Sequence, residues 1–205
     1  MRTEQEKMLA GELYDPSDKT LEAKRMRAHE LCRVLNQTPE TDAETRSKLL
    51  HELFGHLGEG TYITCPLQID YGEFTTFGER CFANFNFTVL DTCPVTIGND
   101  VFFGPNCSLL TPLHPMLPEE RNLRRREDGS YYDLEYGAPI TIGDGCWIAS
   151  DVKICGGVTI GAGSVIGAGS VVTRSIPAGV LAAGNPCRVI RPITSADSLE
   201  GARVK

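Results

Sequence analysis

Branched aliphatic residues recur at every sixth position in the C-terminal half of the chain. The series runs without a slip, and a small residue, often Gly, usually follows each member. Its members are Ile142, Ile148, Ile154, Ile160, Ile166 and Val172. A period of six matches neither the 3.6-residue period of an α-helix nor the two-residue period of a half-buried strand. The spacing predicts a solenoid in which three hexapeptides form one triangular coil and the aliphatic side chains stack inside.

The same period is present upstream in two blocks, the second starting two residues out of phase with the first. The blocks are Phe77, Ala83 and Val89, and then Ile97, Phe103 and Leu109. A β-sandwich with glycine-rich turns is the alternative fold, but sandwich strands alternate in twos and do not produce a period of six. We therefore expect a mainly β protein, with a β-helix of hexapeptide repeats over residues 61–192.

Residues 1–60 have a different pattern, with only four of the 21 glycines, and the spacing predicts an N-terminal helical segment. One helix is expected between Thr20 and Leu35. A second is expected around an apolar face of Leu49, Leu50, Leu53, Phe54 and Leu57. Its start is expected at the capping-box spacing Thr41 to Glu44, or alternatively at Thr38-Pro39. Such short helices need another part of the chain to pack against.

The repeat is interrupted between Leu109 and Ile140, and a solenoid extrudes such an insertion as a surface loop, here about residues 112–138. This loop contains His114, the only histidine after residue 60, between Pro112 and Pro115. A single histidine there is either a general base or a structural residue. It cannot hold the zinc of a hexapeptide-repeat carbonic anhydrase, which needs several histidines. The run Arg124–Arg126 is interpreted as a solvated face of the loop without a catalytic role.

Composition and charge narrow the classes of partner. The net charge of -7 disfavours nucleic acid, yet residues 145–196 carry one acid against four basic residues, which suits a small anionic ligand. No apolar stretch is long enough to cross a membrane, and the polar start resembles no secretory signal, so we expect a cytoplasmic protein. The eight cysteines include no CxxC motif and no histidine completes a zinc set. We therefore expect buried, reduced thiols and no bound metal.

Several blocks resemble the maltose and galactoside O-acetyltransferase group of hexapeptide-repeat acyltransferases, over nearly the whole chain. They are EKMLAGELYDPSDKTL, DYG at 70–72, CFANFNFTVLD, PVTIGNDVFFGPN, PITIGDGCWIASDVKICGGVTIGAGSVIGAGSVVTRSIPAG and AAGNPCRVIR. The resemblance implies a left-handed parallel β-helix and a homotrimer with active sites between subunits. It also implies direct acetyl transfer from acetyl-CoA, a co-substrate rather than a permanently bound cofactor, to a sugar hydroxyl such as that of maltose or glucose. His114 matches the general base of the family.

The resemblance also assigns binding residues. Acceptor contacts match Asn84, Asp70, Asp91 and Asp15, and Asp91-Thr92 replaces an acidic pair of the galactoside enzymes, which favours the maltose type. Ser150 matches a position whose backbone N–H stabilises the thioester oxygen, and Trp147 lies at the pantetheine channel by the same comparison. The remaining contacts to CoA match Ala168, Thr173, Arg174, Arg188 and Arg191. A turn, packing or ion-pair role is the structural alternative at each of these positions.

Two features depart from the family or leave a choice open. The loop from Met116 to Gly137 is longer and more charged than in the relatives, so an oligosaccharide or a xenobiotic hydroxyl is an alternative acceptor. If the protein is not an enzyme, the alternative is a non-catalytic trimeric scaffold that binds CoA. The tail of residues 193–205 is polar and is expected to be disordered.

Overall fold

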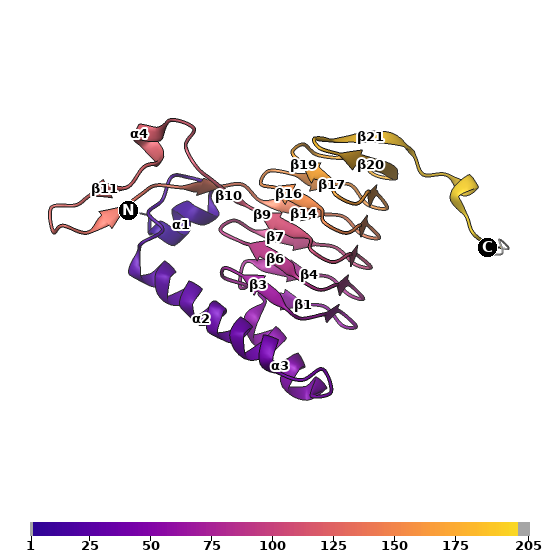
Figure 1. The fold of residues 1–205 in the computed structure, drawn as a ribbon, viewed down its shortest axis with the longest axis horizontal. Coiled ribbons are helices and arrows are strands. Elements are labelled where there is room, and N and C mark those ends of the chain that lie inside the picture. The colour runs from indigo at the N-terminus through magenta and orange to yellow at the C-terminus, as the bar shows by residue number, and fades with distance from the viewer. Residues whose placement is uncertain (1, 201–205) are drawn as a thin grey trace.

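The structure is a computed structural model that describes residues 2–200. The chain forms a three-sided stack of coils, and each coil contributes one short strand to each of three sheets (Figure 1). Sheet 1 contains β1 (His56–Leu57), β4 (Thr75–Phe77), β7 (Val95–Ile97), β14 (Ile140–Ile142) and β17 (Thr159–Ile160). Sheet 2 contains β2 (Tyr62–Ile63), β5 (Phe82–Ala83), β8 (Phe102–Phe103), β15 (Trp147–Ile148), β18 (Val165–Ile166), β20 (Val180–Gly184) and β21 (Cys187–Pro192). Sheet 3 contains β3 (Leu67–Ile69), β6 (Phe87–Leu90), β9 (Ser108–Leu110), β16 (Lys153–Cys155) and β19 (Val171–Val172).

Neighbouring strands of the three sheets are parallel, apart from the antiparallel pair β20 and β21 that ends the stack. The residues of the six-residue period pair with one another from coil to coil, as in Phe77 with Ile97 and Ile142 with Ile160. Ile97 also pairs with Ile142, so the register continues across the insertion. The mainly β solenoid predicted from the hexapeptide spacing is therefore confirmed.

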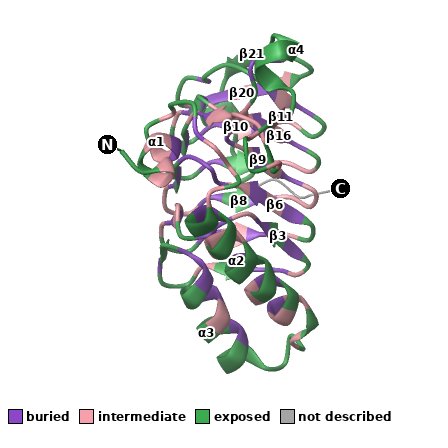
Figure 2. Cartoon of the chain, turned by 90° about the vertical axis from the view of Figure 1, so that its left-hand side faces the viewer, coloured by how far each residue is buried: buried purple, intermediate pink, exposed green. Residues whose placement is uncertain are grey.

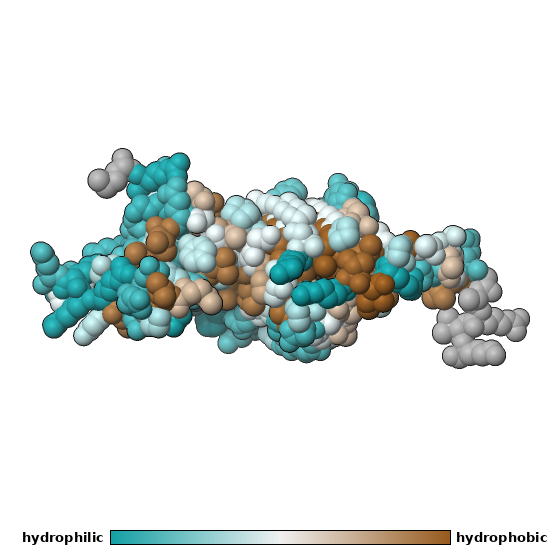
Figure 3. Space-filling model, turned by 90° about the horizontal axis from the view of Figure 1, so that it is seen from above, coloured by the Kyte–Doolittle hydropathy of each residue, from teal (hydrophilic) through white to brown (hydrophobic). Residues whose placement is uncertain are grey.

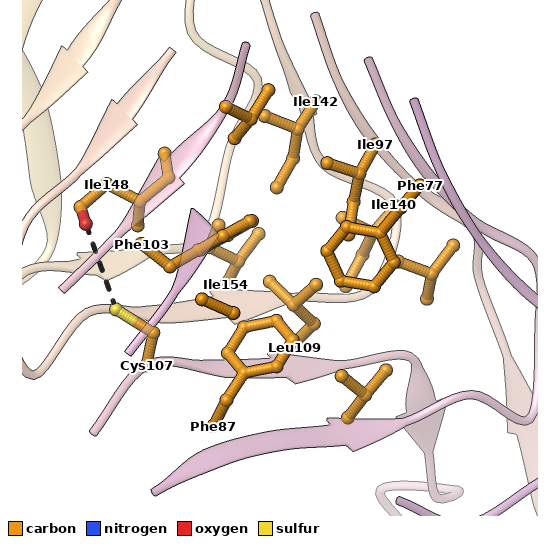
Figure 4. Close-up of a cluster of buried hydrophobic side chains, with 14 of the residues drawn as sticks. Phe77, Phe87, Ile97, Phe103, Cys107, Leu109, Ile140, Ile142, Ile148 and Ile154 are labelled. Atoms are coloured by element: carbon orange, nitrogen blue, oxygen red, sulfur yellow. Dashed lines mark hydrogen bonds between the residues drawn. The ribbon is translucent and has the colours of Figure 1, made fainter. Parts of the chain in front are cut away.

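The periodic side chains form the core (Figure 4). Five members of the series are fully buried: Ile148, Ile154, Ile160, Ile166 and Val172. In the coils nearer the N-terminus, aromatic rings fill the same column, and the ring centres of Phe87 and Phe103 lie 4.8 Å apart. Burial of such aliphatic side chains stabilises a fold by roughly 1.5–3 kcal/mol each. The core is thus a continuous column rather than a central cluster, and it needs a cover at each end.

Helices cover the N-terminal end of this column. They are α1 (Glu4–Leu9), α2 (Lys19–Gln37) and α3 (Ala43–Leu53). α2 buries Ala28, Cys32 and Leu35 in the main core and packs on β3, while α3 lies beside β1. Figure 2 shows that the outer sides of α2 and α3 are exposed and that purple, buried residues line the coils behind them. The helix expected at residues 20–35 is confirmed.

The second helix differs from the expectation at both ends. Its N-cap is Asp42, whose carboxylate accepts from the N–H of Thr45, whereas Thr38 is the C-cap of α2. An aspartate satisfies the first free N–H groups of a helix as well as a threonine does, so the cap falls one residue later than predicted. The helix ends at Leu53, and Leu57, predicted on its apolar face, instead lies in β1 and pairs with Phe77.

The extruded loop leaves the stack after β9 and returns at β14. β10 (Pro112–Leu113) pairs with β13 (Tyr136–Gly137), and β11 (Arg124–Arg125) pairs with β12 (Tyr131–Tyr132). The short helix α4 (Pro118–Arg121) connects β10 to β11, and the loop projects away from the coils on the side of α1 (Figure 1).

The other expectations on the chain concern its tail and its cysteines. Residues 195–197 form the short 3-10 helix η1 (Ser195–Asp197), so this part of the expected disordered tail is ordered, while residues 201–205 lie outside the described residues. All eight cysteines are free thiols, and six of them are buried. No helix within residues 2–200 has both the length and the apolar composition to cross a membrane.

Candidate active site

Most of the predicted site residues lie on two different edges of the three-sided stack. We call the edge between sheets 3 and 1 the loop-bearing edge; it is formed by residues 70–74, 91–94, 111–139, 156–158 and 173–175. We call the edge between sheets 2 and 3 the plain edge; it is formed by residues 84–86, 104–107, 149–152 and 167–170. The loop-bearing edge carries Asp70, Asp91, His114, Thr173 and Arg174. The plain edge carries Asn84, Ser150 and Ala168. The structure therefore groups these residues into two sets and does not bring the sets together in one chain.

His114 follows β10, where the loop begins. Its side chain is 47% exposed, and Nε2 lies 3.7 Å from Oε2 of Glu135. This separation is within ion-pair range and too long for a hydrogen bond. The neighbouring Pro115 is buried, so the backbone that carries the imidazole is anchored while the ring faces solvent. An exposed imidazole beside a carboxylate can accept a proton from a ligand and is stabilised when it becomes charged.

Glu135 is a site residue that no motif in the sequence indicated. It lies immediately before β13, and its side chain is only 15% exposed. Burial raises the pKa of Glu135, while the hydrogen bond from Tyr14 and the charge of His114 act in the opposite direction. The sequence could have indicated Glu135 only through the topology of the loop. An extruded loop returns to the edge it left, so residues just before Ile140 come close to residues just after Leu110.

Asp70 lies on the same edge, two coils toward the N-terminus. Its Oδ1 atom is 3.7 Å from Nε2 of His29, which α2 contributes and which the sequence did not indicate. Burial raises the pKa of Asp70, and the charges of His29 and Arg25 oppose that shift. The loop-bearing edge thus has two partly buried carboxylates, each beside a histidine.

The structure corrects the expectation that Asp91 contacts an acceptor. Asp91 has no exposed surface, and its carboxylate accepts from the N–H of Tyr71 at 2.8 Å and the hydroxyl of Thr75 at 2.9 Å. Burial raises its pKa to about 6. Because the acid is enclosed by the turn that it holds together, Asp91 is a structural residue of the loop-bearing edge.

Asp15 is also engaged within the chain. Its Oδ1 atom accepts from the hydroxyl of Ser17 at 2.6 Å, and its Oδ2 atom is paired with Arg126. The guanidinium of Arg126 lies 4.5 Å from the ring centre of Tyr132. Arg126 was expected on a solvated face of the loop; instead it fastens the loop to the N-terminal segment and occupies the predicted acceptor contact.

The plain edge forms a shallow apolar hollow of about 390 Å³ on the face of sheet 2. It is lined by Phe82, Asn84, Phe102, Phe103, Gly104 and Trp147. Oδ1 of Asn84 accepts from the N–H of Phe85 at 2.8 Å, so the amide nitrogen is the group of this side chain that can donate to a ligand. The indole of Trp147 is 55% exposed on the same face.

Ser150 follows Trp147 in the next turn of the plain edge. Within residues 2–200, no acceptor binds its backbone N–H. Gly104 packs against it so closely that a Cβ atom there would lie 2.6 Å from this nitrogen. The next coil contributes Gly169, whose N–H donates to the carbonyl oxygen of Ser150 at 2.9 Å. The tight stacking of these turns fixes the direction of the N–H.

The predicted phosphate ligands lie toward the C-terminal end of the stack. Arg174 and Arg188 are exposed, and Arg191 is paired with Asp197 of η1 at 2.6 Å. Figure 3 shows hydrophobic residues gathered over this end, and Val189 and Ile190 of β21 are both exposed. Cations beside exposed apolar residues suit a ligand that combines phosphates with an apolar part.

A stack of hexapeptide coils with an extruded histidine loop defines a hexapeptide-repeat acyltransferase with a left-handed β-helix. Residues 7–58 match the maltose acetyltransferase hexapeptide capping motif, residues 139–174 match the bacterial transferase hexapeptide (six repeats), and residues 94–111 match the hexapeptide repeat of succinyl-transferase. The chain belongs to the maltose and galactoside O-acetyltransferase family, and it is an acyltransferase.

Individual relatives cover nearly the whole chain. Galactoside O-acetyltransferase of Escherichia coli (strain K12) is 41% identical over 192 residues, which are 94% of this chain and 90% of that protein. The crystal structure of a maltose O-acetyltransferase from Clostridium difficile 630 has a TM-score of 0.87 at 41% identity and covers 95% of this chain and 99% of its own. The structure of a galactoside acetyltransferase in complex with coenzyme A has a TM-score of 0.87 at 40% identity, and the match covers 96% of this chain and 94% of that one.

Proposed function

We propose that this protein transfers an acetyl group from acetyl-CoA to a hydroxyl of a sugar such as maltose or glucose. The observation that supports this most directly is the exposed imidazole of His114 beside the partly buried carboxylate of Glu135, in a member of a sugar O-acetyltransferase family. Two relatives of known structure were solved with coenzyme A or acetyl-CoA bound. An acetyl donor and a neutral hydroxyl acceptor are the reactants that this arrangement suits.

The chemistry requires a base because a sugar hydroxyl is protonated at neutral pH. His114 takes the hydroxyl proton as the acceptor oxygen attacks the thioester carbon, and the thioester oxygen becomes negatively charged. The tetrahedral species then expels the CoA thiolate, which takes the proton back from the imidazolium. General base catalysis of this kind contributes roughly 100- to 10,000-fold to the rate. The charge of Glu135 stabilises the imidazolium while it exists.

The plain edge supplies groups that suit the other reacting atoms. The N–H of Ser150 is directed to the thioester oxygen, where one such donor stabilises the transition state by roughly 3–4 kcal/mol. The amide of Asn84 donates to the acceptor, and Asp70 holds a second acceptor hydroxyl from the loop-bearing edge. Trp147 packs along the pantetheine arm, and Ala168 lines the same edge one coil further on.

Since His114 and Ser150 lie on different edges of one chain, we propose that each site forms between two subunits of a homotrimer. The loop-bearing edge of one subunit then faces the plain edge of its neighbour. The exposed aromatic side chains of sheet 2 support this assembly, because Phe102 and Trp147 are paired in register and are each more than half exposed. Exposed apolar surface of this kind marks an interface.

The CoA phosphates are assigned to the C-terminal coils. Thr173 and Arg174 follow β19 on the loop-bearing edge, and Arg188 and Arg191 lie on β21. Arginine binds phosphate through two hydrogen bonds at once. Arg191 has to exchange its contact with Asp197 for such a bond, so its contribution is expected to be smaller than that of Arg174.

The test is the release of free thiol from acetyl-CoA with maltose, glucose and a thiogalactoside as acceptors, with the parent and with His114→Ala. We expect release with a sugar and a loss of about 100- to 10,000-fold in the variant. His51→Ala is the matched control, since His51 is an exposed histidine of α3 outside the site. Unchanged turnover in His114→Ala contradicts the proposed base. Binding of acetyl-CoA without thiol release from any acceptor supports the scaffold instead.

A further inference from the structure

The N-terminal segment reaches the loop-bearing edge and contacts the carboxylate beside His114. Tyr14 is fully buried, and its hydroxyl donates to Oε1 of Glu135. The two residues also exchange backbone hydrogen bonds: the N–H of Tyr14 donates to Glu135 at 3.0 Å, and the N–H of Glu135 donates to Tyr14 at 3.2 Å. Three hydrogen bonds thus join positions that are far apart in the sequence.

Neighbouring contacts hold this part of the segment against the loop. A Cβ atom on Gly11 would lie 2.9 Å from the carbonyl oxygen of Gly137, so the two backbones touch. The thiol of Cys93 donates to the carbonyl oxygen of Met8 at 3.1 Å. Further out, Arg126 of the loop binds Asp15. Tyr14 therefore lies among several contacts that hold the N-terminal segment against the loop-bearing edge.

We propose that Tyr14 is a positioning residue for acetyl transfer, because its hydroxyl fixes one oxygen of Glu135 and thereby holds the other oxygen beside the imidazole of His114. The inference rests on the proposed function. Tyr14 touches neither reactant and acts through Glu135. It makes the N-terminal segment part of the catalytic machinery as well as a cover for the core.

The division of the two carboxylate oxygens supports this role. Oε1 of Glu135 is bound by Tyr14, whereas Oε2 is the oxygen that lies 3.7 Å from Nε2 of His114. A carboxylate that keeps its donor stays ionised and oriented, and one that loses the donor in a buried site gains a proton more easily. The titratable or charged groups that face Glu135 are Tyr14, His114, Asp133, Asp70 and Tyr71.

Tyr14→Phe tests the role, since it removes the hydroxyl and keeps the buried ring. The first readout is the titration of Glu135 by carbon NMR, without substrates. We expect the pKa of Glu135 to rise in the variant, because the hydrogen bond from Tyr14 lowers it in the parent. The second readout is kinetic. We expect kcat to fall about 10-fold near neutral pH with an unchanged KM for acetyl-CoA, and the loss to shrink as the pH rises and Glu135 ionises again.

Tyr62→Phe is the matched control. The hydroxyl of Tyr62 also donates to a glutamate, Glu40 at 3.1 Å, but this pair lies on sheet 2 and in the connection between α2 and α3 rather than on the loop-bearing edge. The control is expected to leave the titration of Glu135 and the pH profile unchanged. If Tyr14→Phe behaves like Tyr62→Phe in both readouts, Tyr14 only packs and the inference is wrong.

Two further results keep the inference separate from folding and from the proposed function. Glu135→Gln is expected to lower kcat as Tyr14→Phe does, and the double variant is expected to be no slower than Glu135→Gln alone. Losses that multiply show independent action and overturn the inference, and Glu135→Gln with full activity overturns it even if Tyr14→Phe does not fold. If the parent transfers acetyl to no acceptor, the proposed function fails, whereas the titration of Glu135 still reports whether Tyr14 controls this carboxylate.

Discussion

The plain edge and the loop-bearing edge are built from the same repeat but are held together in different ways. On the plain edge, each short turn stacks on the turn of the next coil, as where Gly169 donates to Ser150 and Gly104 packs against Ser150. On the loop-bearing edge, side chains distant in sequence meet, as where Tyr14 binds Glu135 and Asp15 binds Arg126. One edge is determined by local turn geometry, and the other by tertiary contacts.

This difference separates two requirements of the proposed reaction. A backbone N–H directed at a developing charge must be rigid, and the repeated turns of the plain edge provide that rigidity. A base and an acceptor pocket must suit a particular substrate, and the loop, which the repeat does not constrain, provides that variation. The proposed assembly brings one edge of each kind together at every site.

The largest expected effect comes from combining subunits that are each defective on one edge. His114→Ala and Asn84→Ala are each expected to be inactive alone. Co-expressed with two different tags, they are expected to recover about a quarter of the parent activity, because one site in four then pairs an intact loop-bearing edge with an intact plain edge. Thiol release by all trimers of the mixture, without selection for the mixed ones, measures the recovery, and the two tags show that mixed trimers are present.

The control for this experiment is the parent co-expressed with a chain that carries both substitutions. Sites between subunits retain about a quarter of the activity in that mixture, and sites within one subunit retain about half. If the first mixture recovers almost no activity and the second retains about half of the parent activity, both edges of a site belong to the same chain. That result would contradict the proposed sites between subunits.

A second experiment concerns the buried acid of the loop-bearing edge. The pKa of Asp91 is raised to about 6 in the folded protein, from an ordinary value of 3.8. The folded state therefore binds more protons than the unfolded state between these values, and this group lowers the free energy of unfolding as the pH rises from about 4 to about 6.

Asp91→Asn is expected to remove that fall. The amide can still accept from Tyr71 and donate to Thr75, so the turn keeps its hydrogen bonds. Relative to the parent, the variant is expected to gain about 2–3 kcal/mol in the free energy of unfolding between pH 4 and pH 7. Urea unfolding at four pH values measures the difference, and a difference that does not change with pH contradicts the assignment.

The smallest effect is expected on the plain edge, from Gly104→Ala. The added methyl group would lie 2.6 Å from the N of Ser150, so the coils must separate, which typically costs about 1–3 kcal/mol. The displaced N–H is also expected to lower kcat. Gly163→Ala is the control, because its backbone has a φ of 66° but no atom lies within 4 Å of the added carbon. It is expected to lose stability without losing kcat; equal kinetic losses in both variants would show that Ser150 is not displaced.

The solenoid was predictable from the sequence because its period is local. Each Ile of the series occupies the same position in its own hexapeptide, so the burial of Ile148 follows from the same pattern as the burial of Ile166. The fastening of the loop was not predictable in this way. Arg126 and Glu135 lie in an aperiodic segment, and their partners Asp15 and Tyr14 are more than a hundred residues away.

The same limit explains the corrections to the predicted site. The family resemblance placed Asp91 among acceptor contacts, but a sequence position does not show whether a carboxylate faces a pocket or the inside of a turn. Asp91 is enclosed because Tyr71 and Thr75, from the preceding coil, donate to it. His114 was identified because it is the only histidine in the repeat region, whereas Glu135 is one of many acids and has no such distinction.

The unbroken register between Ile97 and Ile142 has a consequence for how the chain folds and diversifies. Pairing these two strands closes the whole loop in one step, and the entropy lost on closure grows only with the logarithm of the loop length, about 0.6 kcal/mol for each doubling. A longer or shorter loop therefore changes the folding equilibrium little. This segment, and with it the surface proposed to meet the acceptor, can therefore change in length while the rest of the molecule stays as it is.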